Sequence, residues 1–235
     1  ILLCCATFVS DAFSASLWSL HSQAESPQAW SGYYAGALLG GQFGRSYDET
    51  GGFGYNADND KWTYSQSGSN VGLKMGYSFP WQKIYIGPEI EVGYIDVSGR
   101  AAQPSSPGSD TVGKTSSDFY TMFRAKAGID VQQYLLFVTG GAIGMNYTNQ
   151  VRDNCSVAPC GGATIDASTK GLTWGYTLGG GVEHMLSKNW SAQLEYFYFN
   201  LNTQNFNGTT NLGNAYSWSG QTYGNVIRGG VSYYF

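Results

Sequence analysis

The stretch Asn225–Phe235 reads NVIRGGVSYYF, and an apolar residue or a glycine stands at every second position from Phe235 back to Ile227. The positions between them hold tyrosine, serine, glycine and the charged Arg228. Successive side chains leave a pleated strand on opposite faces, so this alternation predicts a β-strand with one apolar and one polar face. The fold must therefore provide a suitable environment for an arginine opposite an apolar face.

The composition narrows the class of protein. Charged residues make up 12% of the 235 residues, aromatic residues make up 16%, and there are 33 glycines. This excludes a disordered chain, which would be rich in charge and poor in aromatic residues. The formal net charge of −4 argues against a nucleic-acid partner, since such a partner calls for a basic surface. No segment approaches the roughly 18 apolar residues of a membrane helix.

Three segments are predicted along the chain. Residues 1–15 contain an apolar run followed by small residues, which is typical of a secretory signal peptide, here truncated at its start. A frayed hydrophobic end or a buried strand is the alternative interpretation of this run. Residues 16–29 are predicted to form a linker, and residues 30–235 are predicted to form a single β-rich domain.

Two cysteines follow the predicted signal peptide, Cys155 and Cys160. An even pair in an exported protein predicts a disulfide, here one that closes a short loop. A metal site is the alternative, but it would need further Cys or His residues nearby in the sequence. Because so short a loop loses little chain entropy on closure, the predicted disulfide would serve local shape.

Strand-like and loop-like segments alternate regularly after residue 30. Eight segments have strand character, each about nine or more residues long: 30–44, 62–79, 84–97, 117–130, 134–148, 170–186, 189–200 and 221–235. Tight turns at 79–83, 130–133 and 186–189 alternate with long polar loops at 45–61, 98–116, 149–169 and 201–220. Short periplasmic turns and long extracellular loops are typical of outer-membrane barrels, and a soluble sandwich gives no reason for them. The alternation predicts an all-β fold, an eight-stranded antiparallel up-and-down transmembrane β-barrel.

The polar faces of these strands collect charges of both signs in equal number. They hold four cations and four anions: Lys74, Arg124, Lys126 and Arg228, with Glu89, Glu91, Glu183 and Glu195. A soluble sheet turns its charged face to water, whereas in a membrane barrel the apolar face meets lipid and the charges point inward. Buried charges need partners, so we predict an ion-pair network in the lumen, with the individual pairings left open.

Two details of the strands are less regular. The segment 134–148 is apolar on both faces, so the alternation does not assign its lipid and lumen sides. Pro88 lies inside the segment 84–97, where it removes a hydrogen-bond donor of the ladder and predicts a bulge.

Four short motifs carry a family resemblance. They are WSGYYAG at 30–36, TGGA at 139–142, GGGVE at 179–183 and RGGVSYYF at 228–235. In this order they resemble the small outer-membrane immunogenic-protein and porin-like β-barrels of Gram-negative bacteria. The resemblance implies a barrel in the cell outer membrane, among its lipids and lipopolysaccharide. It also implies that the assembly machinery reads the C-terminal strand through Phe235.

The expected size of the lumen bears on function. With about eight strands, a barrel interior is just filled by side chains or holds one small ligand. Tyr85, Tyr120 and Met122 are expected to fill it together with the charged residues, so we predict a plugged lumen. The protein is then predicted to be a non-enzymatic structural and surface protein, a surface antigen whose loops contact host or environment. The alternatives are a haem-binding or small-ligand-binding barrel, a narrow channel and, with less support, a lipid-modifying enzyme with its site at the rim.

No catalytic, metal or cofactor site is predicted. His21 precedes the barrel and His184 stands beside a predicted periplasmic turn, so neither is placed to act as a base at the outer rim. The acidic residues Asp48, Glu49, Asp58 and Asp60 miss the spacing of a calcium loop and are interpreted as a solvated acidic loop.

Overall fold

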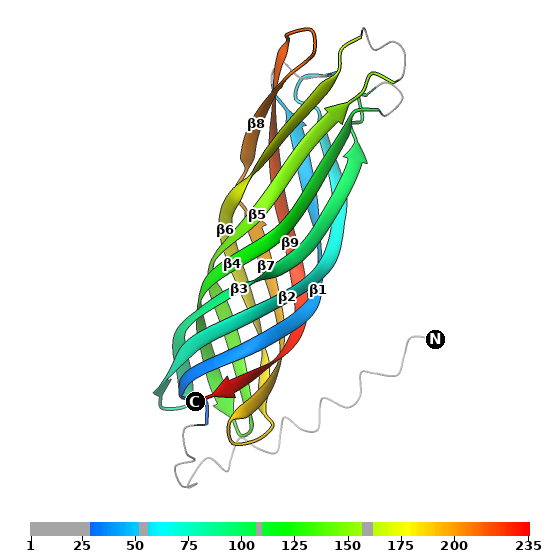
Figure 1. Ribbon diagram of the computed structural model, residues 1–235. Coiled ribbons are helices and arrows are strands. Elements are labelled where there is room, and N and C mark those ends of the chain that lie inside the picture. Colours follow the sequence, from blue (N-terminus) through cyan, green and yellow to red (C-terminus); the bar gives the residue numbers. More distant parts are fainter. Residues whose placement is uncertain (1–28, 52–55, 107–109, 157–161) are drawn as a thin grey trace, which may run out of the picture.

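The computed structural model describes residues 29–51, 56–106, 110–156 and 162–235. These residues form one antiparallel sheet of nine strands that closes into a barrel (Figure 1). The strands are β1 (Gly32–Thr50), β2 (Lys61–Trp81), β3 (Ile84–Ala102), β4 (Val112–Val131), β5 (Tyr134–Asp153), β6 (Ile165–Met185), β7 (Trp190–Leu201), β8 (Gln204–Thr209) and β9 (Ala215–Tyr234). The described residues include no helix that is long and apolar enough to span a membrane.

Eight of the nine strands make the ring. Each pairs with its neighbour in the order β1 to β7 and then β9, and β9 pairs back with β1. The strand β8 pairs with β9 beyond the end of β7. Asn200 of β7 lies opposite Tyr223 of β9, and Gln204 of β8 lies opposite Gly220 of β9. Between these two pairs the chain advances four residues from β7 to β8 but only three residues along β9. This irregularity splits the seventh strand in two, which is why nine strands stand where eight were predicted.

The lipid-facing belt occupies the end of the barrel that carries the short turns. On β1 it extends from Tyr33 to Phe43, both strongly exposed, which matches the roughly 9 to 11 residues of a tilted membrane strand. Exposed aromatic side chains mark both borders of the belt: Tyr33, Phe79, Trp81, Tyr134, Trp190 and Phe235 at the turn end, and Phe43, Tyr94, Phe119, Trp174, Tyr176 and Tyr196 at the other. Such girdles are typical of membrane interfaces.

The three predicted turns are confirmed at 82–83, 132–133 and 186–189. Gln82 and Gln132 adopt positive φ angles of 59° and 63°, as two-residue hairpin connections require. Both chain ends of the barrel lie at this end, where the Phe235 N–H donates to the Tyr33 carbonyl oxygen at 3.0 Å.

The long loops are much shorter than predicted. About half of the residues in the ranges 45–61, 98–116, 149–169 and 201–220 belong to strands, and the outer connections are 51–60, 103–111, 154–164 and 210–214. The strands therefore continue well past the belt, at the upper end of Figure 1. There water replaces lipid around the barrel, so the apolar side chains move to the inner face. On β3 the exposed Val92 and Tyr94 lie in the belt, and the buried Ile95 and Val97 follow directly.

The face assignments of the opening stretch are confirmed. Ile227, Val231 and Phe235 are exposed on the lipid face, whereas Arg228 is buried in the lumen. The structure also assigns the ambiguous strand β5. Leu135 and Phe137 are buried inside, while the intervening Leu136 and Val138 are exposed. Its alternation was hidden because apolar residues line the lumen at this strand as well.

The bulge predicted at Pro88 is wrong. Pro88 lies opposite Ala125 in an unbroken register between β3 and β4. The missing proline N–H interrupts only the pairing with β2, where the ladder passes from Gly76–Glu89 to Phe79–Ile86 without a shift. The register shifts instead between Tyr94 and Val97, at the outer border of the belt.

Candidate functional site

The lumen is filled in layers along the barrel axis. The turn end holds an aromatic cluster of Trp30, Tyr34, Tyr85, Leu135 and Tyr234. A central apolar cluster contains Ile95, Val97, Tyr120, Met122, Ile143, Met145, Tyr147, Phe197, Phe199, Leu201 and Val226. A third cluster, of Trp62, Tyr64, Val151, Ile165, Ala167, Phe206 and Trp218, lies at the outer end. The predicted charged residues lie between the first two clusters.

We call these eight residues the ion-pair layer: Lys74, Glu89, Glu91, Arg124, Lys126, Glu183, Glu195 and Arg228. Each of their side chains is at most 7% exposed. Strand alternation explains their common position, since all of them stand at lumen-facing positions of their strands.

Arg124 lies at the centre of the ion-pair layer. Its guanidinium donates to Glu195 at 2.6 Å and to Glu91 at 3.1 Å, and it also pairs with Glu89. Arg228 donates to Glu91 at 2.7 Å and to Glu195 at 2.8 Å. Two arginines and three glutamates thus form one continuous network, in which charge-assisted hydrogen bonds satisfy the buried groups.

The two lysines of the ion-pair layer lie closer to the turn end. The Lys74 amine lies 3.2 Å from Glu89 and also donates to Gln193, while the Lys126 amine lies 2.6 Å from Glu183. Both amines approach the ring of Tyr34, at 5.1 Å and 5.2 Å from its centroid. The aromatic cluster therefore stabilises the cations from below through cation–π contacts.

Several of these contacts cross the lumen. Arg228 on β9 pairs with Glu91 on β3, and Arg124 on β4 pairs with Glu195 on β7. Each of these pairs joins strands that are three places apart in the eight-membered ring. Among the ion pairs of the layer, Glu89–Arg124 and Glu195–Arg228 join residues that are direct cross-strand neighbours. The ion-pair layer therefore crosses the lumen and connects opposite sides of the barrel wall.

Hydroxyl groups complete the coordination of the carboxylates. Tyr34 donates to Glu89 at 3.0 Å and Tyr120 donates to Glu91 at 2.6 Å. Ser191 and Tyr234 donate to Glu183 at 2.5 Å and 3.2 Å. The sequence analysis did not identify these hydroxyls as members of the network. Their lumen-facing strand positions were the available signal.

Asp48 was interpreted as part of a solvated acidic loop, and this interpretation is wrong. It lies on β1, five residues beyond the belt residue Phe43, and is fully buried in the lumen. The Tyr64 hydroxyl and the Asn149 amide donate to it at 3.1 Å and 2.7 Å. No cation of the described residues pairs with it. Burial raises the pKa of Asp48 to about 6, although the hydrogen bonds from Asn149 and Tyr64 act in the opposite direction.

Replacing Asp48 with asparagine is expected to stabilise the barrel at neutral pH. A carboxyl group whose pKa is raised on folding stabilises the fold only while it is protonated, so the wild type loses this contribution as the pH rises from about 4 to about 6. Asp48→Asn should then be more stable than the wild type at pH 8 by about 1 to 2 kcal/mol, with the difference vanishing near pH 4. Urea unfolding of both proteins in detergent micelles at the two pH values measures this. A variant less stable at pH 8 would contradict it.

The other candidate residues lie apart from the lumen network. His184 stacks on Tyr134 at the turn end, with its Nδ1 at 3.2 Å from the Gln133 carbonyl oxygen. Cys160 lies outside the described residues, so the disulfide with Cys155 stays a prediction. In the described ranges, no three His, Cys, Asp or Glu side chains gather where they could hold a metal ion.

Comparisons with known proteins agree with this architecture. The sequence profile of the outer membrane protein beta-barrel domain matches residues 12–235. Similar solved structures include the outer membrane protease OmpT from Escherichia coli (9% identity, 92% of this chain and 99% of that chain, TM-score 0.53). They also include OprG from Pseudomonas aeruginosa (11% identity, 87% of this chain and 97% of that chain, TM-score 0.52). Another is Neisserial surface protein A (14% identity, 87% of this chain and 98% of that chain, TM-score 0.45).

At 9% and 11% identity, the likeness to OmpT and OprG establishes the fold alone. A comparison with curated protein sequences yields no match. The family profile spans most of the chain, the closed barrel with a lipid-facing belt agrees with it, and both place the protein in the outer membrane of a Gram-negative bacterium. The chain belongs to the outer membrane protein beta-barrel family.

Proposed function

We propose that the protein is a non-enzymatic structural and surface component of the outer membrane, with a lumen closed by the ion-pair layer. The observation that carries this proposal is the set of buried ion pairs that bridge opposite strands, such as Arg228–Glu91 and Arg124–Glu195. The aromatic cluster below and the apolar cluster above support it, because both fill the interior with side chains. An open aqueous channel belongs to much wider barrels.

The outer end of the barrel is the part that meets the surroundings. Its strands extend beyond the belt and carry the connections 51–60, 103–111, 154–164 and 210–214 at their tips. Aromatic stacking between Phe206 and Trp218, at a centroid distance of 5.7 Å, and backbone pairing between β8 and β9 hold this end together. We infer that it presents short connections on a rigid stem to host or environmental surfaces, in place of the long loops first expected.

An enzymatic function has weaker support. OmpT is a protease by its description, but the 9% identity restricts the likeness to the fold. His184, the one histidine of the described residues, lies at the turn end, away from the outer rim where an extracellular substrate would bind. The proposal is therefore a protein that acts by contact and by filling the membrane.

Planar bilayer recordings test the closed lumen. The purified barrel should show no large, stable conductance steps at neutral pH, because charged side chains and aromatic rings occupy its interior. Shortening the connections 51–60 and 210–214 should leave this behaviour unchanged, because the ion-pair layer lies deeper in the barrel. Regular conductance steps of the wild-type protein would contradict the proposal.

Binding measurements test the surface role. Wild-type barrel should adhere to candidate host or environmental surfaces, and a barrel with trimmed outer connections should adhere less. The trimmed variant must still show heat-modifiable migration in gels, which reports an intact barrel. Equal adhesion by the trimmed barrel would remove the outer end from the proposal, and hydrolysis of lipid acyl chains or of a peptide would replace it with an enzymatic function.

A second candidate function, binding of a small polar ligand, is favoured by one observation. Gln42 and Gln66 are 3% exposed in the outer part of the lumen, and their amide atoms have no hydrogen-bond partner among the described residues. Buried amides normally have partners, so these two groups could hold a small polar molecule. Protection of the barrel against thermal unfolding by such a molecule, lost in Gln42→Leu, would favour this function.

A further inference from the structure

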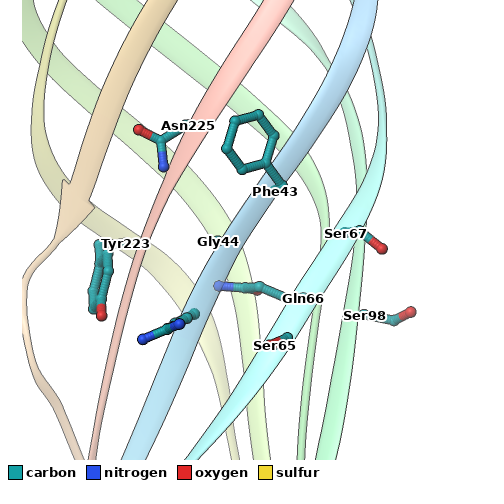
Figure 2. A pocket seen from close by; sticks show the side chains of 9 residues that line it. Phe43, Gly44, Ser65, Gln66, Ser67, Ser98, Tyr223 and Asn225 are labelled. Atoms are coloured by element: carbon teal, nitrogen blue, oxygen red, sulfur yellow. The ribbon is translucent and has the colours of Figure 1, made fainter. Parts of the chain in front are cut away.

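A hollow of about 500 Å³ lies on the outer wall of the barrel, where β9, β1, β2 and β3 run side by side. Figure 2 shows Phe43, Ser65, Ser67 and Tyr223 around it on neighbouring strands. Phe43 is the last apolar residue of β1 before the strand leaves the belt. The hollow therefore lies at the border between the acyl chains of the outer leaflet and its headgroups.

The polar side chains around the hollow suit an anion. Arg45 lines it together with the hydroxyl groups of Ser65, Ser67, Ser98 and Tyr223, and none of the described residues that line it carries a carboxylate. All of these groups can donate hydrogen bonds. Asn225 also lines the hollow, and its Oδ1 already accepts from the Tyr196 hydroxyl at 2.6 Å, which leaves its amide nitrogen as a further donor.

Arg45 differs from two other cations on the outer wall, Lys61 and Arg152. Lys61 pairs with Glu49 at 3.1 Å, and Arg152 pairs with Asp166 at 3.7 Å. Arg45 is exposed and has no ion-pair partner within the described ranges. An unpaired guanidinium beside an aromatic side chain at a membrane border presents a charge-assisted, bidentate donor to an anionic headgroup.

Further cations continue from this point toward the outer end. Ser67 lies opposite Ser98, and Arg100 follows two residues later on the same face of β3. Arg100 lies directly opposite Lys114 of β4, and both side chains are exposed. Like charges opposite each other destabilise a sheet, so an anionic layer around the barrel would relieve this repulsion. Arg100 and Lys114 thus complement a phosphorylated surface above the belt.

We propose that this hollow binds a phosphate group of an outer-leaflet lipid, held by Arg45 and the surrounding hydroxyls, while an acyl chain of the same lipid lies along Phe43 and Leu39. The apolar residues favour a lipid over a soluble anion. Leu39 is 67% exposed on the same face of β1 as Phe43, with Gly41 between them, and it continues the apolar path into the belt. The proposal rests on the outer-membrane location and does not depend on a closed lumen.

Titration of the folded barrel with lipopolysaccharide in an uncharged detergent tests the site. Arg45→Gln should weaken binding roughly tenfold, which is the loss expected for one charge-assisted contact. Arg152→Gln is the matched control, because it removes another exposed cation of the outer wall, one that already has a partner. Arg45→Lys keeps the charge without the bidentate geometry and should fall between wild type and Arg45→Gln. Heat-modifiable migration checks that every variant is folded.

Two further arms identify the recognised group. Dephosphorylated lipopolysaccharide should bind wild type and Arg45→Gln equally, and inorganic phosphate should compete only weakly. Equal binding of phosphorylated lipopolysaccharide by Arg45→Gln and Arg152→Gln would overturn the proposal. Tight binding of the dephosphorylated form at this site would remove the phosphate from it, and full competition by inorganic phosphate would remove the lipid. The closed lumen is tested separately by conductance, so a failure of the lipid-binding proposal leaves the proposed function intact.

Discussion

Replacing Arg124 with methionine is expected to lower the free energy of unfolding by about 3 to 5 kcal/mol. Arg124 pairs with Glu89, Glu91 and Glu195, and the substitution leaves three buried carboxylates with two cations of the central network nearby, Lys74 and Arg228. A buried charge without sufficient partners keeps its full desolvation cost, and methionine fills the volume without replacing the lost hydrogen bonds. Urea unfolding in detergent micelles, followed by tryptophan fluorescence, measures the change.

A control at the surface separates burial from charge. Arg152→Met removes an ion pair whose side chains are 60% and 52% exposed, so it should change the stability by about 0 to 1 kcal/mol. Adding Glu195→Gln to Arg124→Met should restore part of the loss, because it neutralises one of the stranded carboxylates. Equal unfolding midpoints for Arg124→Met and Arg152→Met would show that the ion-pair layer contributes nothing beyond a surface pair.

Replacing Gly93 with isoleucine is expected to cost about 3 kcal/mol or more. Gly93 on β3 faces the lumen opposite Tyr120, whose ring lies against it. A Cβ atom at Gly93 would clash with the backbone oxygen of Val71 and would lie 2.6 Å from both the Cζ and the hydroxyl of Tyr120. The larger side chain therefore forces the tyrosine away and breaks its 2.6 Å hydrogen bond to Glu91. The same urea assay measures the effect.

Matched substitutions test the cause of this loss. A Cβ atom at Gly171 on β6 meets no atom of the described residues within 4 Å, so Gly171→Ile should leave stability nearly unchanged. Adding Tyr120→Val to Gly93→Ile removes the clash with the ring but leaves the contact with the Val71 backbone, so the double variant should lose less than the sum of its single changes. Additive losses would show that contact with Tyr120 is not the reason that position 93 holds glycine.

The lumen charges could be predicted because strand alternation is local. Glu89 and Glu91 stand at alternate positions of one strand, and the same count places Arg228 on the inner face of another. Which charge meets which could not be predicted. The contact of Arg228 with Glu91 depends on the register of three intervening strand pairs and on the reach of a long side chain across the lumen.

The outer half of the barrel was missed for a physical reason. Between 45 and 50, polar residues stand on both faces of β1, so no apolar alternation marks a strand. Asp48 looked solvated because the sequence does not show that Tyr64 and Asn149 approach it from other strands. On β3 the apolar residues face outward up to Tyr94 and inward from Ile95. The rule that apolar residues face outward, which holds in the belt, therefore assigns the residues beyond Tyr94 to the wrong face of the sheet.

This change of face places one continuous sheet in two solvents. In the belt, hydrocarbon surrounds the strands and the closed ladder of backbone hydrogen bonds is the main stabilising contribution, since an unsatisfied peptide group in lipid costs several kcal/mol. Beyond Phe43, water surrounds the same strands, and residues such as Trp62, Trp218 and Val151 form a core of the ordinary kind. Apolar burial from water weakens on cooling, because its driving force near room temperature is entropic. The outer end of the barrel therefore loses stability on cooling, as a small water-soluble domain does. The stability of the belt depends much less on water, because hydrocarbon surrounds it.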